Sequence, residues 1–152
     1  MKVNLMYNKI LLPTDGSKPA LKATEHAMWT AGQSDAEIIA LHVIDITPFT
    51  GLPTEESVKS VKEMLVNEGK KAFNEIFDMS LKYRQETGKE LKISFVTREG
   101  HPADTILKVI EDQDFDLVVM GTSGKHGMDR FLLGSVAENV VRSSKSPVLV
   151  VR

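Results

Sequence analysis

The chain has 152 residues, of which 41% are hydrophobic and 26% charged, and this suits a single globular domain spanning residues 1–152. Its net charge is -2 and no basic block stands out, so we expect no nucleic-acid partner. The absence of cysteine excludes disulfides and thiol chemistry. Without a long apolar run or an apolar signal-peptide core, the sequence predicts no membrane span and a cytoplasmic location.

Five short apolar runs along the chain predict five β-strands. They lie at residues 9–13, 37–44, 91–96, 116–120 and 147–151. Between them, apolar residues recur three or four positions apart, which predicts helices, the second over roughly 54–86 with Thr54 as its cap. The alternation of strand and helix predicts an α/β fold with an open parallel sheet and helices on both faces. In such sheets, ligands bind beyond the carboxyl ends of the strands, where the strand order reverses.

The segment GTSGKHGMDRFLLGS, residues 121–135, is unusually long for a connection between a strand and a helix. Such connections typically take about two to six residues. Glycines at 121, 124 and 134 allow positive φ angles or a close approach of backbone N–H groups to a ligand. Ser135 then opens a helix, whose first N–H groups and dipole favour an anion. The segment therefore predicts a phosphate-binding loop.

Simpler explanations exist for some of these residues. Ser135 and Glu138 fit the S-x-x-E pattern of a capping box, in which the two side chains satisfy N–H groups of the helix itself. Asp15 and Ser17, which follow the first strand, are residue types that also serve as turn and cap. Capping explains neither the length of the loop nor the glycines at 121 and 124.

Two common phosphate-binding signatures are absent. Gly124 and Lys125 are followed by His126, and no glycine stands at the offset that a Walker motif requires. The dinucleotide pattern G-x-G-x-x-G occurs neither here nor after the first strand, where the sequence is LLPTDGS. A nicotinamide-dependent enzyme is therefore disfavoured.

The complete spacing of the loop is Gly121, two residues, Gly124, nine residues, Gly134 and Ser135. This pattern resembles the nucleotide-binding form of the universal stress protein family. The segments LLPTDGS, ALHVID, EGHPAD and SPVLVV agree, so the resemblance spans nearly the whole chain. It implies a Rossmann-like, adenine-nucleotide alpha-hydrolase-like sheet of five parallel strands in the order 3-2-1-4-5. ATP would bind at the switch between strands 1 and 4.

The resemblance also assigns individual positions to the nucleotide. They are Pro13, Thr14, Asp15, Val43, Met120, Gly121, Gly124, Gly134, Ser135 and Val136. Pro13, Thr14 and Asp15 would line the nucleoside side, with Asp15 near the ribose or near the phosphates and their Mg²⁺ or Mn²⁺. The backbone of Val43 would contact adenine, and Met120 would pack on the base.

In the same assignment, Gly121 and Gly124 would approach the ribose and phosphates, and residues 134–136 would cradle the phosphates. Val43 and Met120 are equally explained as core residues of strands. Lys125, in the loop, could reach phosphate or be a solvated charge.

Three functions fit the sequence to different degrees. The first is an ATP-binding regulatory module of the stress-response type. The second is a slow Mg²⁺-dependent ATPase, which is disfavoured because no catalytic base or arginine finger is evident. The third is a nucleotide-free interaction module, against which the complete glycine pattern argues. Residues 45–54 form either a plain connector or a lid over the ligand.

The last apolar run, residues 147–151, would be an edge strand in the order 3-2-1-4-5. Exposed edges are normally blunted by charges, proline or a bulge, and here Pro147 protects only the first position. Two such strands meeting antiparallel across a two-fold axis would satisfy both edges. The sequence therefore predicts a homodimer through the C-terminal strand, as the resemblance also implies.

Overall fold

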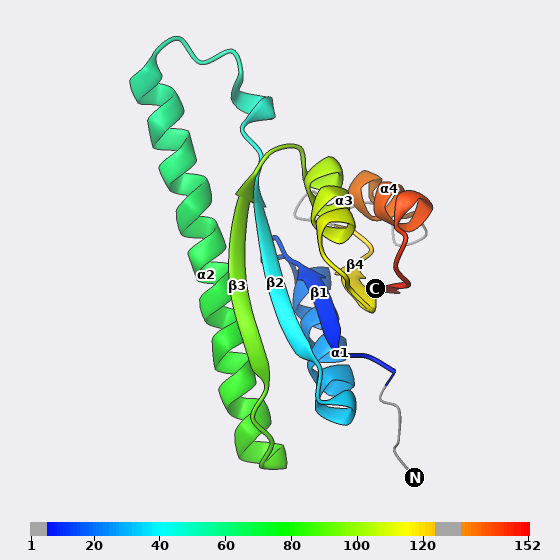
Figure 1. The fold of residues 1–152 in the computed structure, drawn as a ribbon. Helices are drawn as coiled ribbons and strands as arrows, with labels where there is room; N and C mark the ends of the chain where they lie inside the picture. Colours follow the sequence, from blue (N-terminus) through cyan, green and yellow to red (C-terminus); the bar gives the residue numbers. More distant parts are fainter. Residues whose placement is uncertain (1–5, 124–131) are drawn as a thin grey trace.

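The computed structural model describes residues 6–123 and 132–152 of the chain. They form a parallel sheet in the order β3-β2-β1-β4-β5 (Figure 1). The strands are β1 (Lys9–Pro13), β2 (Glu37–Ile44), β3 (Lys92–Glu99), β4 (Leu117–Gly121) and β5 (Val148–Val151). The predicted α/β fold and its strand order are thus confirmed.

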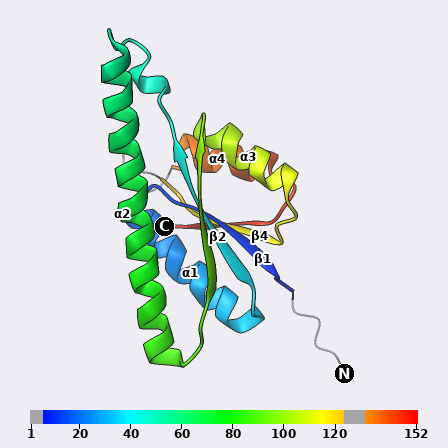
Figure 2. The same cartoon turned by 60° about the vertical axis from the view of Figure 1, so that its left-hand side comes forward.

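Helices cover both faces of this sheet (Figure 2). They are α1 (Lys18–Ser34), α2 (Glu55–Thr87), α3 (Pro102–Asp112) and α4 (Ser135–Ser143), with a short 3₁₀ helix at Thr47–Phe49. The helices α1 and α2 pack on one face, and α3 and α4 pack on the other. Within the described part of the chain, no helix is long and apolar enough to cross a membrane.

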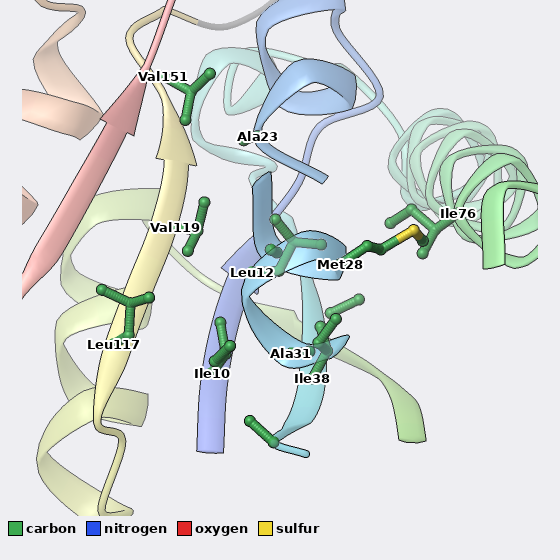
Figure 3. Close-up of a cluster of buried hydrophobic side chains, with 13 residues drawn as sticks. Ile10, Leu12, Ala23, Met28, Ala31, Ile38, Ile76, Leu117, Val119 and Val151 are labelled. Carbon is green, nitrogen blue, oxygen red and sulfur yellow. The ribbon is translucent and has the colours of Figure 1, made fainter. Parts of the chain in front are cut away.

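The central strands are buried on both faces. Ile10 and Leu12 of β1 point toward α1 and α2, into the cluster of buried side chains in Figure 3. Leu11, between them, joins the second cluster under α3 and α4. This alternation follows from the two-residue period of a strand. It explains why residues 10–13 of the run KILLP are all apolar.

Helix α2 is the longest element, and Gly69, Ala72 and Ile76 are its buried residues. Thr54 caps it as predicted, because its Oγ1 accepts a hydrogen bond of 3.1 Å from the N–H of Ser57. Its first turns project beyond the carboxyl end of the sheet in Figures 1 and 2. Most of this helix therefore adds little to the core.

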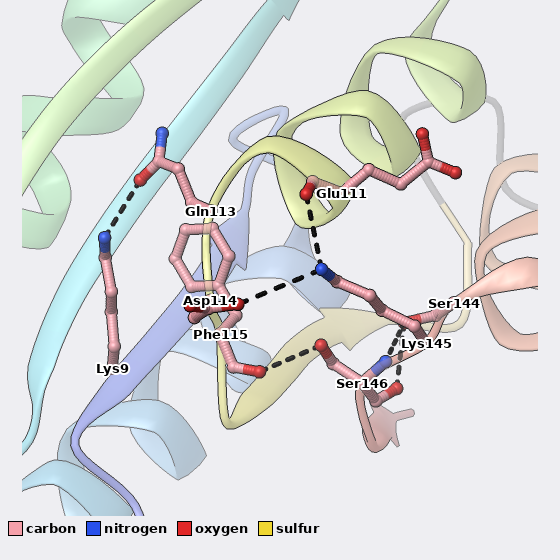
Figure 4. A network of polar contacts seen from close by, with 8 residues as sticks. All are labelled: Lys9, Glu111, Gln113, Asp114, Phe115, Ser144, Lys145 and Ser146. Atoms are coloured by element: carbon pink, nitrogen blue, oxygen red, sulfur yellow. Dashed lines mark hydrogen bonds and ion pairs between the residues drawn. The ribbon is translucent and has the colours of Figure 1, made fainter.

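Polar contacts tie the strands together at the amino end of the sheet (Figure 4). Lys9 Nζ donates to Gln113 Oε1 at 3.0 Å and lies 5.1 Å from the centre of the Phe115 ring. Ser146 Oγ donates to the Phe115 carbonyl at 2.9 Å. These contacts join the first residue of β1 to the segments that lead into β4 and β5. The opposite, carboxyl end of the sheet is where the predicted site residues lie.

Candidate functional site

The strand order reverses between β1 and β4, at the centre of the sheet. These two strands pair over a short register, Ile10 with Leu117 and Leu11 with Val118. The helix after β1 covers one face and the helix after β4 covers the other. The segments that follow β1 and β4 therefore lead to opposite faces of the sheet. A crevice is expected between them, outside the carboxyl ends of these two strands.

The turn after β1 is held by its own side chains. The N–H of buried Thr14 donates to the carbonyl of Leu41 at 2.8 Å, and its Oγ1 accepts from the N–H of Gly16 at 3.2 Å. Asp15 Oδ1 accepts from the N–H of Ser17 at 2.9 Å. Ser17 is the N-cap of α1, and its Oγ accepts from the N–H of Ala20 at 3.3 Å. Turn and cap roles are therefore confirmed for Asp15 and Ser17.

Gly16 is required by this turn. Its φ of +76° lies in the left-handed region, which residues with a side chain rarely adopt. A Cβ there would also lie 3.3 Å from the Cβ of Ala72 in α2. The turn therefore passes close to α2 on its way from β1 to α1.

The backbone of Val43 faces the end of β1. The N–H of Glu37 donates to the carbonyl of Asn8, and the carbonyl of Leu41 accepts from Thr14. Odd-numbered residues of β2 thus turn their N–H and C=O toward β1, and the period of two extends this to Val43. Since β1 ends at Pro13, opposite Leu41, no hydrogen bond between described residues connects Val43 to β1. The N–H donor and the C=O acceptor of Val43 therefore point toward the expected crevice.

Gly121 ends β4 against the start of α1. A Cβ at this position would lie 2.8 Å from both the carbonyl carbon and the Cβ of Pro19, and 3.1 Å from the N of Ala20. Its φ is not positive. Close approach of two backbones, rather than unusual conformation, therefore requires glycine here.

Gly134 closes the long loop onto β4. Its N–H donates to the carbonyl of Thr122 at 2.7 Å, and the N–H of Thr122 donates to the carbonyl of Val151 in β5. A Cβ on Gly134 would lie 3.2 Å from that Thr122 oxygen. Its φ of -63° is ordinary, so close approach again explains the glycine. The amino termini of α1 and α4 thus both lie beside the end of β4.

The predicted capping box at the start of α4 is wrong. Gly134, not Ser135, is the N-cap, and no side chain caps this helix among the described residues. Ser135 is the first helical residue and is exposed. Glu138 instead pairs with Arg142 one turn later, at 2.6 Å. The simpler explanation that competed with anion binding at this helix start is therefore removed.

The remaining predicted positions are largely packed into the core. Pro13 is the buried last residue of β1, and Met120 is buried under α3 and α4. Val43 and Val136 are half-buried against the same cluster. These four side chains are apolar, so they can offer a ligand only apolar contacts. Gly124 lies outside the described residues, as does Lys125.

One residue at this end was missed by the sequence analysis. His42 is buried, and its ring nitrogens lie 3.2 Å from the carbonyl oxygen of Thr14 and 3.3 Å from that of Leu65 in α2. Both partners are backbone carbonyls distant in sequence, so no residue pattern signals them. The segment ALHVID contains His42, but nothing in that segment indicates its contacts with Thr14 and Leu65.

Other features of the described residues do not compete with this site. No group of three or more His, Asp or Glu in 6–123 and 132–152 could hold a metal ion. An open groove of about 530 Å³ on α4 is lined by Leu132, Leu133, Glu138, Val141 and Arg142. None of these is a predicted site residue. The predicted positions that the structure describes lie together at the carboxyl ends of β1, β2 and β4 and the start of α4.

Comparison with known proteins shows which family the chain belongs to. A model of the universal stress protein family matches residues 6–152. The chain belongs to the universal stress protein family. A universal stress protein of Methanocaldococcus jannaschii, MJ0531, is 44% identical over 147 residues, covering 97% of this chain and 83% of the relative. One of Methanothermobacter thermautotrophicus is 40% identical over 149 residues, covering 97% of both.

Solved structures of universal stress proteins share the fold. The structure of MJ0577 from M. jannaschii superposes with a TM-score of 0.80 at 37% identity, covering 96% of each chain. UspA from Lactobacillus plantarum also gives 0.80, at 26% identity over 96% of this chain and 98% of its own. A universal stress protein in complex with cAMP gives 0.69 at 27% identity, covering 97% and 98%. That relative binds an adenine nucleotide.

Proposed function

We propose that this universal stress protein is a cytoplasmic ATP-binding module of the stress-response type that hydrolyses ATP slowly at most. The observation that carries the proposal is the convergence of two helix amino termini, at Ser17 and Gly134, on the end of β4. Helix amino termini present unpaired N–H groups and a favourable dipole to anions. The complete glycine spacing supports a polyphosphate as that anion.

Adenine is the base that the crevice fits best. Val43 presents one backbone donor and one backbone acceptor side by side, beyond the end of β1. Adenine carries an amino donor where guanine carries a carbonyl acceptor. In the same pose, guanine would therefore set its carbonyl against the Val43 carbonyl. The relative that binds cAMP supports an adenine nucleotide.

The metal would arrive with the nucleotide. Asp15 is the acidic residue of the turn after β1, and the described residues hold no group of three or more His, Asp or Glu that could bind an ion alone. Mg²⁺ typically keeps few protein ligands and is bound through substrate phosphates. We therefore assign Mg²⁺ or Mn²⁺ to the phosphates, with Asp15 as the carboxylate that would help to hold it.

Slow turnover follows from the same residues. Phosphoryl transfer needs a positioned water, charge stabilisation and a metal. The described turn offers a carboxylate already hydrogen-bonded to Ser17, and no described residue of the predicted site is a histidine or arginine. A phosphate-release assay should give a rate far below the median enzyme value of about 10 s⁻¹. Rapid multiple turnovers would instead make the protein an ATPase.

Calorimetric titration tests the binding proposal directly. We expect ATP with Mg²⁺ to bind and GTP to bind at least about tenfold more weakly, because a mismatched hydrogen bond leaves a polar group unpaired. Mass spectrometry of nucleotide released from the purified protein would identify the natural adenine nucleotide. No heat with millimolar ATP, or equal heats with GTP, would contradict the proposal.

We also propose a homodimer formed through β5. This strand is an edge of the sheet, and Leu149 in it is 38% exposed. Pro147 and Val151 direct their carbonyls to β4, so Val148 and Val150 direct their backbone groups outward. A second copy can pair with these groups antiparallel, with Leu149 opposite Leu149 of that copy.

A further inference from the structure

His42 joins three elements at the carboxyl end of the sheet. This residue is 5% exposed and lies near the end of β2. Nδ1 lies 3.2 Å from the carbonyl oxygen of Thr14, directly after β1, and Nε2 lies 3.3 Å from that of Leu65 in α2. The ring meets the Phe73 ring edge-on, with an interplanar angle of 86°. Such placement fixes the ring from three sides.

Helix α2 makes room for this ring at Gly69. A Cβ at Gly69 would overlap Cδ2 of His42 and lie 2.9 Å from its Cγ. A glycine inside a helix costs about 1 kcal/mol relative to alanine. The space that it opens for His42 accounts for a glycine in the middle of α2.

The carbonyl groups of Thr14 and Leu65 differ in whether they have a hydrogen-bond donor other than His42. Leu65 lies inside α2, where its carbonyl accepts the N–H four residues later. Thr14 lies beyond the end of β1, and among the described residues His42 is the only hydrogen-bonding partner found for its carbonyl. Buried carbonyls in native structures are almost always paired. The hydrogen bond that matters is therefore Nδ1–H to Thr14.

The same contact determines what Val43 can bind. The N–H of Thr14 donates to Leu41, and a regular parallel ladder would continue with the N–H of Val43 donating to the carbonyl of Thr14. That bond is not formed between these described residues. His42 holds the Thr14 carbonyl instead. The Val43 N–H thus stays available at the crevice.

We propose that His42 is a positioning residue of the nucleotide site. By donating from Nδ1 to the Thr14 carbonyl, it keeps that carbonyl from the Val43 N–H, and it braces the turn at 14–17 against α2. This inference rests on the proposed function for the identity of the ligand. The contacts of His42 can be tested without any ligand.

Substitutions at His42 separate its hydrogen bond from its volume. His42→Leu removes the donor and keeps an apolar side chain in the space. His42→Asn places an amide donor where Nδ1 stands. We expect His42→Leu to weaken ATP binding about tenfold, the ratio expected for one lost buried hydrogen bond, and His42→Asn to retain most of the affinity. His26→Leu, on the exposed side of α1, is the matched control and should bind as the parent does.

Amide hydrogen exchange gives a readout that simple packing would not change. In the parent without nucleotide, the Val43 amide should exchange rapidly, and nucleotide should protect it. In His42→Leu without nucleotide, the released Thr14 carbonyl should accept from Val43 and slow its exchange by about tenfold or more. An unchanged exchange rate in His42→Leu, or parental ATP affinity in that variant, would overturn the inference.

Two further measurements decide the matter if His42→Leu does not fold. Ring nitrogen chemical shifts of the parent should show a proton on Nδ1, whereas a proton on Nε2 alone would overturn the inference. Gly69→Ala should displace the ring from the α2 side, free the Thr14 carbonyl and slow the exchange of the Val43 amide in the same way. Unchanged Val43 exchange in that variant would overturn the inference. A parent that binds no ATP would refute the proposed function, while the exchange and ring measurements would still decide the role of His42.

Discussion

At the residue scale, the glycines around the crevice differ in why they are glycines. Gly16 needs its left-handed φ of +76°, whereas Gly134 has an ordinary φ of -63°. Gly121 and Gly134 are instead places where two backbones nearly touch. The sequence pattern identifies the positions but cannot separate these causes, because each depends on which segment lies opposite.

Gly121→Ala should destabilise the fold. Its Cβ would lie 2.8 Å from the Pro19 carbonyl carbon, and backbone at the start of α1 must shift to admit it. We expect the free energy of unfolding to fall by about 1–3 kcal/mol, as for overpacked sites. Urea denaturation measures this, with Gly51→Ala as the control, since a Cβ there meets nothing within 4 Å. Equal stabilities of the two variants would show that the approach at Gly121 is not tight.

Gly134→Val should reduce nucleotide binding. Its Cβ would lie 3.2 Å from the Thr122 oxygen and 3.3 Å from the Ser123 Cα, so the start of α4 must move away from β4. The displaced N–H groups should lower ATP affinity by about tenfold or more. Titration calorimetry measures the loss, and a thermal melt checks folding. Gly51→Val is the control, and parental affinity in Gly134→Val would remove this helix start from the site.

At the element scale, α1 and α4 begin at the same end of the sheet in different ways. Ser17 caps α1 with its hydroxyl, while α4 begins after Gly134 without a side-chain cap among the described residues. The uncapped helix is the better placed to receive an anion, because its first N–H groups meet no side chain of their own.

Two serine substitutions should distinguish these helix starts. Ser17→Ala removes an N-cap and should lower the free energy of unfolding by about 1 kcal/mol. Ser135→Ala should change it by less than about 0.5 kcal/mol, because Ser135 is an exposed first residue and not the cap. Thermal or urea unfolding compares the two. If Ser135→Ala lowered the free energy of unfolding as much as Ser17→Ala does, Ser135 would be a cap after all.

The elements themselves were largely predictable, and the errors have physical causes. The run at 116–120 corresponds to β4 at Leu117–Gly121, because strands buried on both faces are apolar throughout. The third strand was predicted to end at residue 96 but continues to Glu99. It lies at the edge of the sheet, where its polar residues face solvent and carry no apolar pattern.

The candidate site was predictable in its location but not in its detail. The strand order reversal and the glycine spacing point to the ends of β1 and β4, and the described residues of the predicted site lie at that end of the sheet. Ser135 was predicted to be the N-cap of α4, whereas the N-cap is Gly134 and Ser135 is the first helical residue. The pattern misleads because Ser-x-x-Glu also occurs inside helices. His42 could not be found, since its partners are backbone carbonyls 28 and 23 residues away.

At the scale of the whole molecule, the sheet has two unlike edges. The β3 edge carries Lys92, Arg98 and Glu99, and charged side chains discourage pairing with another strand. The β5 edge is Val148–Val151, with no charged residue inside the strand. Thr122 connects this strand to the candidate site, since its N–H donates to Val151 and its C=O accepts from Gly134. Pairing at β5 would thus bring the second copy next to the site.

Leu149→Lys should convert a dimer into a monomer. In the antiparallel pairing that Val148 and Val150 allow, the two Leu149 side chains lie opposite one another, and like charges directly opposite are destabilising. Light scattering after gel filtration, at tens of micromolar, should give a dimer mass for the parent and a monomer mass for the variant. Thr97→Lys places the same charge on the other edge strand and should leave the dimer intact. A monomeric parent would refute the dimer, and a dimer that survives Leu149→Lys but not Thr97→Lys would move the interface to β3.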